Sequence, residues 1–137
     1  MTDDERRALV ARAMAARTRA YAPYSGYHVG AALLARSGAI YDGVNVENAV
    51  YPAGICAERS ALAEAVSEGE RHFEAIAVAT HNGGSPCGVC RQMLSEFGLE
   101  LDVLLINAQG EVVHATTLRD LLPRAFGADD LKMPNGE

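Results

Sequence analysis

Three cysteines, the only ones in the chain, fall in two short motifs: Cys56-Ala57-Glu58 and Cys87-Gly88-Val89-Cys90. A catalytic zinc site needs three protein ligands, an open fourth position for water and a nearby group that carries protons. Three thiolates and one carboxylate supply this set if the fold brings the two motifs together. We therefore predict that Cys56, Cys87 and Cys90 bind one Zn²⁺ ion and that Glu58 is the catalytic residue.

Each motif taken alone has a simpler interpretation. A single C-x-x-C is as typical of a structural zinc knuckle or a redox pair as of a catalytic centre. A structural zinc site requires a fourth ligand, for which His81 is the best candidate among the four histidines. Glu58 on its own would be a solvated helix residue. The two motifs together favour a catalytic site, and they match the pattern of the zinc nucleobase deaminases, with cysteine in place of histidine.

The composition limits the class of protein and of partner. With 137 residues, 49% hydrophobic and 22% charged, the chain is expected to form one soluble domain over residues 1–137. The acidic N-terminus is unlike a signal peptide, and no apolar run is long enough to cross a membrane. An odd number of cysteines indicates a reducing, cytoplasmic location. A net charge of -6 disfavours a nucleic-acid partner and favours a small-molecule substrate.

Hydrophobic periodicity predicts the order of helices and strands. Helices are predicted over 4–20, with a Thr2–Glu5 capping box, over 56–68, from Ser85 to Gly98, and after Thr117. Strands are predicted over 29–34, 40–46, 74–80, 101–106 and 111–114. In the third helix, Cys90, Met93, Leu94 and Phe97 have the spacing of a buried stripe. This order predicts an α/β fold, a three-layer α/β/α sandwich with a mixed five-stranded sheet.

The predicted helices also place the cysteines at helix ends. Cys56 opens one helix, and Cys87 and Cys90 share one face of the first turn of another. Two helix N-termini would then meet at the metal. Their partial positive charge and unpaired N–H groups stabilise thiolate over thiol.

From end to end the chain resembles the small, homotetrameric cytidine deaminases. The matching segments are Tyr21-Ala22-Pro23-Tyr24-Ser25, Val29-Gly30-Ala31-Ala32-Leu33, Asn45-Val46-Glu47-Asn48-Ala49, Cys56-Ala57-Glu58-Arg59, Ser85-Pro86-Cys87-Gly88, Cys90-Arg91-Gln92, Leu121-Leu122-Pro123 and Ala125-Phe126-Gly127. The resemblance implies the cytidine deaminase fold and zinc-dependent hydrolysis of cytidine and deoxycytidine to uridine and deoxyuridine, with release of ammonia, in pyrimidine salvage. It also implies a homotetramer with one Zn²⁺ per subunit.

The resemblance assigns roles to further residues. It implies that Asn45 and Glu47 bind the ribose hydroxyls, although the surrounding segment alone would be interpreted as a polar turn. It implies that the backbone N–H of Ala57 binds the pyrimidine carbonyl and that Phe126 reaches the substrate of a neighbouring subunit. Relatives usually carry phenylalanine where this chain has Tyr27 against the base, so the added hydroxyl needs a partner.

The net charge of the predicted zinc site indicates one more functional residue. Three thiolates leave a divalent zinc with a net charge of about -1, which works against ionisation of water near neutral pH. Arg59 follows the first motif directly and could offset this charge, and the resemblance implies that it contacts the ligand sulfurs. The alternative is a solvated helix arginine.

Two other functions remain open at this point. A deaminase of aminopyrimidine nucleoside antibiotics would share the zinc motifs, and Asn45 and Glu47 would distinguish it. A structural zinc module that binds a partner protein would have metal but no activity.

Overall fold

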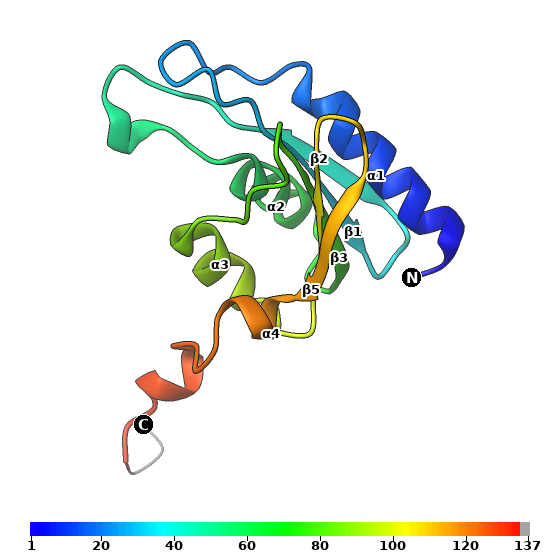
Figure 1. Cartoon of the computed structure of the whole chain (residues 1–137). Helices are drawn as coiled ribbons and strands as arrows, with labels where there is room; N and C mark the ends of the chain where they lie inside the picture. The colour runs from blue at the N-terminus through cyan, green and yellow to red at the C-terminus, as the bar shows by residue number, and fades with distance from the viewer. Residues whose placement is uncertain (135–137) are drawn as a thin grey trace.

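Five strands form one mixed sheet in the computed structural model, which describes residues 1–134 (Figure 1). The strand order is β2-β1-β3-β4-β5, and β3 and β4 form the parallel pair among antiparallel neighbours. The strands are β1 Gly30–Ala35, β2 Ile40–Val44, β3 Phe73–Ala79, β4 Asp102–Ile106 and β5 Val112–Thr117. The helices are α1 Asp3–Arg17, α2 Ala57–Ser67, α3 Gly88–Ser95 and α4 Leu118–Leu121, with short 3₁₀ turns at Tyr51–Ala53 and Ala128–Leu131. The predicted α/β/α sandwich is confirmed.

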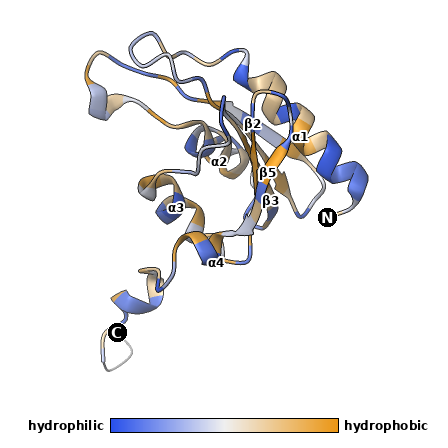
Figure 2. Cartoon of the chain, in the orientation of Figure 1, coloured by the Kyte–Doolittle hydropathy of each residue, from blue (hydrophilic) through white to orange (hydrophobic). Residues whose placement is uncertain are grey.

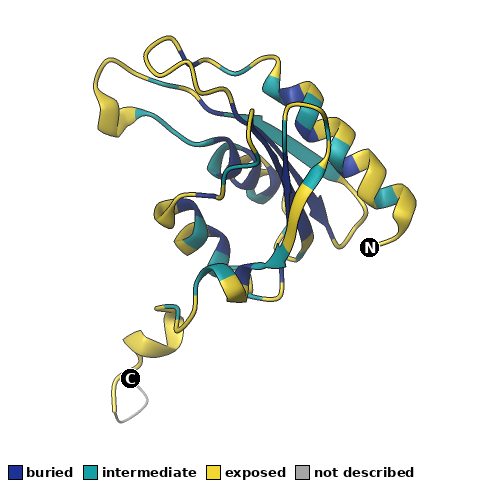
Figure 3. Ribbon diagram, viewed as in Figure 1, coloured by how far each residue is buried: buried dark blue, intermediate teal, exposed yellow. Residues whose placement is uncertain are grey.

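Alternate residues of the central strands face two separate hydrophobic cores. On β1, Ala32 and Leu34 face α1, whereas Ala31 and Leu33 face α2. Figure 3 shows the central strands buried, while the outer faces of the helices are exposed, and Figure 2 shows that the N-terminal end of α1 is hydrophilic. The sheet is thus covered by α1 on one side and by α2 and α3 on the other (Figure 1).

Close backbone packing sets the position of the helix that carries the first motif. A Cβ atom built at Gly43 of β2 would lie 2.4 Å from the backbone nitrogen of Ala61 in α2. The absence of a side chain at Gly43 therefore lets α2 lie directly on the sheet. The hydroxyl of Ser60 adds a hydrogen bond of 3.0 Å to the carbonyl of Val44. These contacts fix the N-terminus of α2 beside the end of β2.

The start of α3 differs from the prediction. Ser85 was predicted as the N-cap with Pro86 in the first turn, but the N-cap is Cys87, whose backbone is extended at φ -67 and ψ 166. Ser85 lies two residues before the N-cap, and its Oγ accepts a hydrogen bond from the side chain of Arg91 instead of from the helix backbone. Met93, which shares the helical spacing of Cys90 and Leu94, is 38% exposed. The later start leaves Cys90 and Leu94 on the buried face.

Other boundaries differ by a few residues. The capping box of Thr2 and Glu5 is confirmed, but α1 ends at Arg17 because residues 18–20 form i→i-3 bonds. The strand β2 ends at Val44, since the backbone N–H of Val46 already bonds to the carbonyl of Ile55. Within residues 1–134, no helix is both long and apolar enough to cross a membrane.

Candidate active site

The three cysteines meet at one point, as predicted. All three Sγ atoms lie within 4.8 Å of one another, with 3.8 Å between Cys56 and Cys87 and 3.5 Å between Cys87 and Cys90. Cys56 is the N-cap of α2 and Cys87 the N-cap of α3, so two helix N-termini do converge here. Tetrahedral ligands about 2.3 Å from zinc are about 3.8 Å apart, so the sulfur positions fit a zinc ion.

The protonation of the cluster also fits a metal site. Hydrogen bonds from Cys90, and then from Arg59 and Cys87, lower the pKa of Cys56 to about 5, which makes it a thiolate at neutral pH. The hydrogen bond with Cys56, burial and the Glu58 charge raise the pKa of Cys90. A metal ion displaces such a proton, since thiolate is the form that coordinates zinc. Among residues 1–134, the group contains the three cysteines and no histidine, so His81 is not a fourth ligand.

Glu58 lies inside the protein beside this cluster. Its side chain belongs to the first turn of α2 and is only 4% exposed, so it is not a solvated helix residue. Burial, and to a lesser extent the charge of Cys56, raise its pKa from 4.5 to about 7. A carboxyl group with this pKa can accept and donate protons at neutral pH, which is what a general acid–base catalyst requires.

A cavity of about 610 Å³ opens next to the cluster and is large enough for a nucleoside. Cys56, Cys87 and Glu58 are among the residues that line it. Asn45, Glu47, Tyr27 and Arg59, all predicted site residues, also line it. Ala57 and Phe126 are not among the lining residues. The sequence did not identify the remaining lining residues: Tyr24, Ser25, Val29, Val46, Asn48, Tyr51, Gly54, Ile55, Val78, Thr80, Gly84 and Ser85.

The carboxylate of Glu47 is fixed by the loop that follows α1. It accepts hydrogen bonds from the hydroxyl of Ser25 and from the backbone N–H groups of Tyr24 at 2.9 Å and Ser25 at 3.0 Å. These bonds, the Ser25 hydroxyl first, lower the pKa of Glu47. An ionised carboxylate accepts hydrogen bonds and cannot donate them, so the part of the cavity wall formed by Glu47 suits hydroxyl groups.

Asn45 is buried and holds the same loop. Its Oδ1 accepts from the backbone N–H of Val29 at 2.9 Å, and its Nδ2 donates to the carbonyl of Tyr27 at 2.7 Å. Asn45 therefore positions the wall of the cavity as well as lining it. No local sequence pattern indicates these partners, since they lie 16 and 18 residues away along the chain.

The hydroxyl of Tyr27 has the partner that the sequence required. Its Oη donates to Oδ1 of Asn82 at 3.3 Å, and its ring meets that of His81 edge-on, with centroids 5.4 Å apart. A Cβ atom at Gly84 would lie 2.4 Å from this Oη. Glycine at this position therefore makes room for the tyrosine.

Arg59 points at the sulfurs. Its Nη2 lies 3.7 Å from Sγ of Cys56, and hydrogen bonds to Cys56 and then Cys90 raise the pKa of the guanidinium. The position is the one that charge compensation requires, because the side chain cannot lose its proton. The alternative of a solvated arginine is therefore wrong.

We expect Arg59→Gln to retain zinc but to lower turnover by about 10–100-fold, the usual cost of losing a partner of a metal ligand. The pH–rate profile should also move to higher pH, because the negative charge of the thiolates is then no longer compensated. Steady-state rates from pH 5 to 10, with zinc measured by atomic absorption, test this. Arg6→Gln, an exposed helix arginine, is the control. An unchanged pH–rate profile would show that the N-termini of α2 and α3 compensate the thiolate charge without Arg59.

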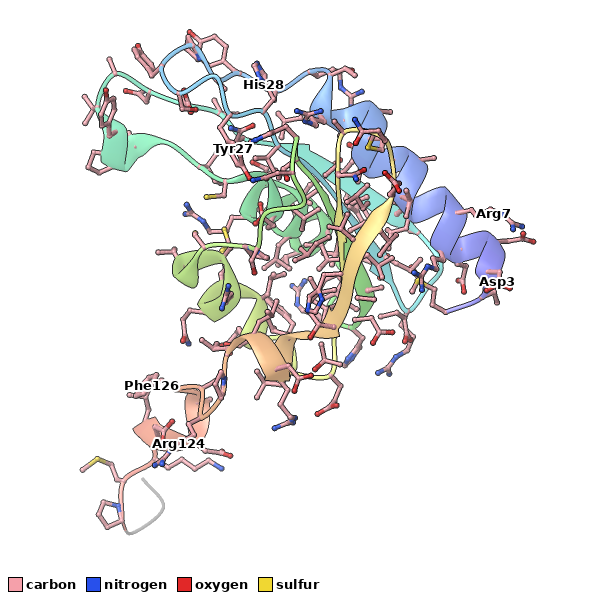
Figure 4. All side chains as sticks on the ribbon, in the orientation of Figure 1. Asp3, Arg7, Tyr27, His28, Arg124 and Phe126 are labelled. Carbon is pink, nitrogen blue, oxygen red and sulfur yellow. The ribbon has the colours of Figure 1, made fainter. Side chains whose placement is uncertain are left out.

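Phe126 lies away from the cavity of its own chain. Figure 4 shows it on the C-terminal segment, far from Tyr27, and its side chain is 55% exposed. Its carbonyl accepts a hydrogen bond from Nε2 of Gln92 at 2.9 Å. Ala57, in contrast, is buried as the first residue of α2. Its backbone N–H is among the first four of the helix, which have no acceptor within the helix.

Comparison with known proteins identifies the family. The model of the cytidine and deoxycytidylate deaminase zinc-binding region matches residues 3–105. Cytidine deaminase of Sporosarcina psychrophila is 48% identical over 126 residues, which cover 90% of this chain and 92% of that protein. The crystal structure of cytidine deaminase from Burkholderia pseudomallei superposes with a TM-score of 0.83 at 49% identity, covering 92% of this chain and all of the other. Cytidine deaminase of Mycobacterium tuberculosis is 41% identical over 133 residues, 96% of each chain. The chain therefore belongs to the zinc-dependent cytidine and deoxycytidylate deaminase family.

Proposed function

We propose that this protein hydrolyses cytidine and deoxycytidine to uridine and deoxyuridine with release of ammonia, as a single catalytic domain over residues 1–137 that acts in pyrimidine salvage. One observation carries the proposal: a buried carboxyl with a pKa of about 7 lies beside a cluster of three cysteine sulfurs, and the carboxyl and two of the cysteines line one nucleoside-sized cavity. Relatives named cytidine deaminase at 40–48% identity over most of the chain support it.

The residues have separate chemical tasks in this proposal. Cys56, Cys87 and Cys90 hold the zinc, which supplies Lewis acidity and lowers the pKa of water. Glu58 accepts a proton from the water that adds to C4 of the cytosine ring and delivers it to the ring nitrogen. It then takes the proton of the hydroxyl that has been added at C4 and transfers it to the departing amine, so that ammonia leaves and the 4-oxo pyrimidine remains. Burial keeps the carboxyl near pKa 7, where both directions of transfer are accessible.

Recognition of the nucleoside uses other residues of the cavity wall together with the N-terminus of α2. The backbone N–H of Ala57 binds the pyrimidine carbonyl, and Tyr27 lies against the base. Asn45 and Glu47 bind the ribose hydroxyls, which suits the acceptor character of a carboxylate whose other bonds hold it in place. A nucleoside carrying free hydroxyls is therefore the substrate class that fits best.

We expect Glu47→Ala to lower kcat/KM for cytidine by about 5–150-fold, the effect of 1–3 kcal/mol for an unpaired buried hydroxyl. The same variant should act on 2′,3′-dideoxycytidine as the wild type does, because that substrate has neither a 2′- nor a 3′-hydroxyl for Glu47 to bind. Parallel ultraviolet assays with both nucleosides measure the ratio of their kcat/KM values in the wild type and in the variant. Equal losses on the two substrates would show that Glu47 acts through the loop and not on the ribose.

The working species in this proposal is a cytoplasmic homotetramer. Large apolar side chains are exposed on the loops and on the C-terminal segment, with Tyr51 75% and Leu131 72% exposed, together with Val50 and Phe126. The C-terminal segment extends away from the sheet in Figure 1, and it is exposed in Figure 3. In this arrangement Phe126 enters the cavity of a neighbouring subunit. The described cysteines are not joined in disulfides, which suits a reducing compartment.

We expect sedimentation at the assay concentration to show a tetramer and no active monomer. Phe126→Ala should raise KM because the cavity is then incomplete, while Met133→Ala, which removes an exposed apolar side chain farther along the same segment, serves as the control. A fully active monomer would exclude the role of Phe126 in a neighbouring site.

One assay tests the function as a whole. Purified protein is analysed for zinc and then incubated with cytidine while the loss of absorbance of the amino pyrimidine is followed. The proposal requires one zinc per chain together with release of ammonia. Zinc without turnover of cytidine or deoxycytidine would favour a structural zinc module, and turnover confined to antibiotic nucleosides would favour the related deaminase.

A further inference from the structure

The side chain of Arg91 binds three backbone and side-chain acceptors at once. Its Nε–H donates to the carbonyl of Pro86 at 2.8 Å, and its Nη2 donates to Oγ of Ser85 at 2.8 Å. Its Nη1 donates to the carbonyl of Leu121, at the end of α4, at 2.6 Å. A guanidinium presents its donors in a rigid fork and stays charged, so three bonds fix it firmly. Arg91 thus joins the segment before Cys87 to the end of α4.

Two contacts besides those of Arg91 hold the segment before Cys87: the backbone N–H of Gly84 donates to Oγ1 of Thr80 at 2.9 Å, and Pro86 is buried. A serine or aspartate at an N-cap usually fixes how the chain enters a helix through a hydrogen bond from its side chain. Cys87 makes no such bond, and its sulfur lies 3.8 Å and 3.5 Å from the other two. Pro86 has no backbone N–H to contribute. The bonds of Arg91 to Ser85 and Pro86 act on the two residues directly before Cys87, so they contribute to the direction in which the chain enters α3.

We propose that Arg91 is a positioning residue for the zinc site, which holds Cys87 against the other two ligands by anchoring its segment to the end of α4. The site then depends on the C-terminal region, because Leu121 lies just before the segment that carries Phe126. Gln92 forms a second link between α3 and the C-terminal segment, because its Nε2 donates a hydrogen bond of 2.9 Å to the carbonyl of Phe126. The inference rests on the proposed assignment of the three cysteines as zinc ligands.

The test measures zinc release from the full-length, zinc-loaded protein into a chromogenic chelator. Arg91→Met removes all three bonds at similar side-chain length, and we expect release to be about 10–100-fold faster. Arg91→Lys can keep one or two acceptors and should give an intermediate rate. Arg119→Met is the matched control, since Arg119 is an exposed arginine of α4 that pairs with Glu100. It should release zinc at the wild-type rate.

Melting temperatures separate positioning from a general effect on folding. A residue that only stabilises the fold lowers the melting temperature of the zinc-loaded and metal-free proteins equally. Loss of positioning weakens zinc binding. The difference in melting temperature between the zinc-loaded and metal-free proteins should therefore be smaller in Arg91→Met and Arg91→Lys than in the wild type. Release at the wild-type rate with an unchanged difference in melting temperature would overturn the inference, and Arg91→Lys decides this if Arg91→Met does not fold. Wild-type protein that binds no zinc would overturn the ligand assignment and this inference with it.

Discussion

Glu58→Gln is expected to abolish nearly all turnover while leaving zinc and fold in place. The carboxamide matches the carboxylate in shape but cannot accept and return a proton. General acid–base catalysis is typically worth about 10²–10⁴ in rate, and Glu58 serves more than one transfer, so we expect the upper end of this range or more. The measurements are kcat with cytidine and zinc content of the same preparation.

The control is Glu64→Gln, which changes an exposed glutamate of the same helix and should leave kcat unchanged. Activity of Glu58→Gln within about tenfold of wild type would show that Glu58 is not the general acid–base catalyst.

A second measurement follows from the raised pKa of Glu58. Since burial raises this pKa from 4.5 to about 7, the folded metal-free protein binds the proton more tightly than the unfolded chain, and stability falls as the pH rises through this range. Metal-free Glu58→Gln should therefore melt above the metal-free wild type at pH 8.

The sequence predicted the sheet and its helices because their signals are local. The Thr2–Glu5 capping box and the apolar runs on both sides of the turn at Gly38 need no information from elsewhere in the chain. The error at α3 has the opposite origin. Ser85 and Pro86 have the residue types of a helix start, but the helix begins at Gly88, and the side chain of Arg91, six residues after Ser85, donates a hydrogen bond to the Ser85 hydroxyl. Local preference was overridden by a tertiary contact.

For the candidate site, too, the sequence predicted the features that depend on local patterns and not those that depend on tertiary contacts. The cysteines and Glu58 could be predicted because metal chemistry requires those residue types at short spacings. The burial of Glu58 and the orientation of Arg59 could not, since residue type alone favours a solvated position for both. The bonds from Ser25 to Glu47 and from Tyr27 to Asn82 join segments 22 and 55 residues apart, and no periodicity connects them. The resemblance named Glu47 and Tyr27 but not the residues that hold them.

Cys87→Ala is expected to have the second large effect, a loss of both zinc and activity. The variant leaves Cys56 and Cys90 as the remaining sulfur ligands, and two ligands do not complete the three-ligand set of a catalytic zinc site. Cys87 is the informative choice because its side chain is exposed, whereas Cys90 is buried in the core and its removal would also leave a cavity. Metal content should fall from about one zinc per chain to a small fraction.

This variant and Glu58→Gln together separate the metal site from proton transfer. Glu58→Gln should keep its zinc and lose turnover, whereas Cys87→Ala should lose both, and added zinc should not restore its rate. Val89→Ala, an exposed change in the first turn of the same helix, is the control and should keep both. Thiolate ligation also requires zinc to dissociate from the wild type as the pH falls, because protons compete for the sulfurs. Full zinc occupancy and activity in Cys87→Ala would mean that the metal is held elsewhere and that the close approach of the three sulfurs has another purpose.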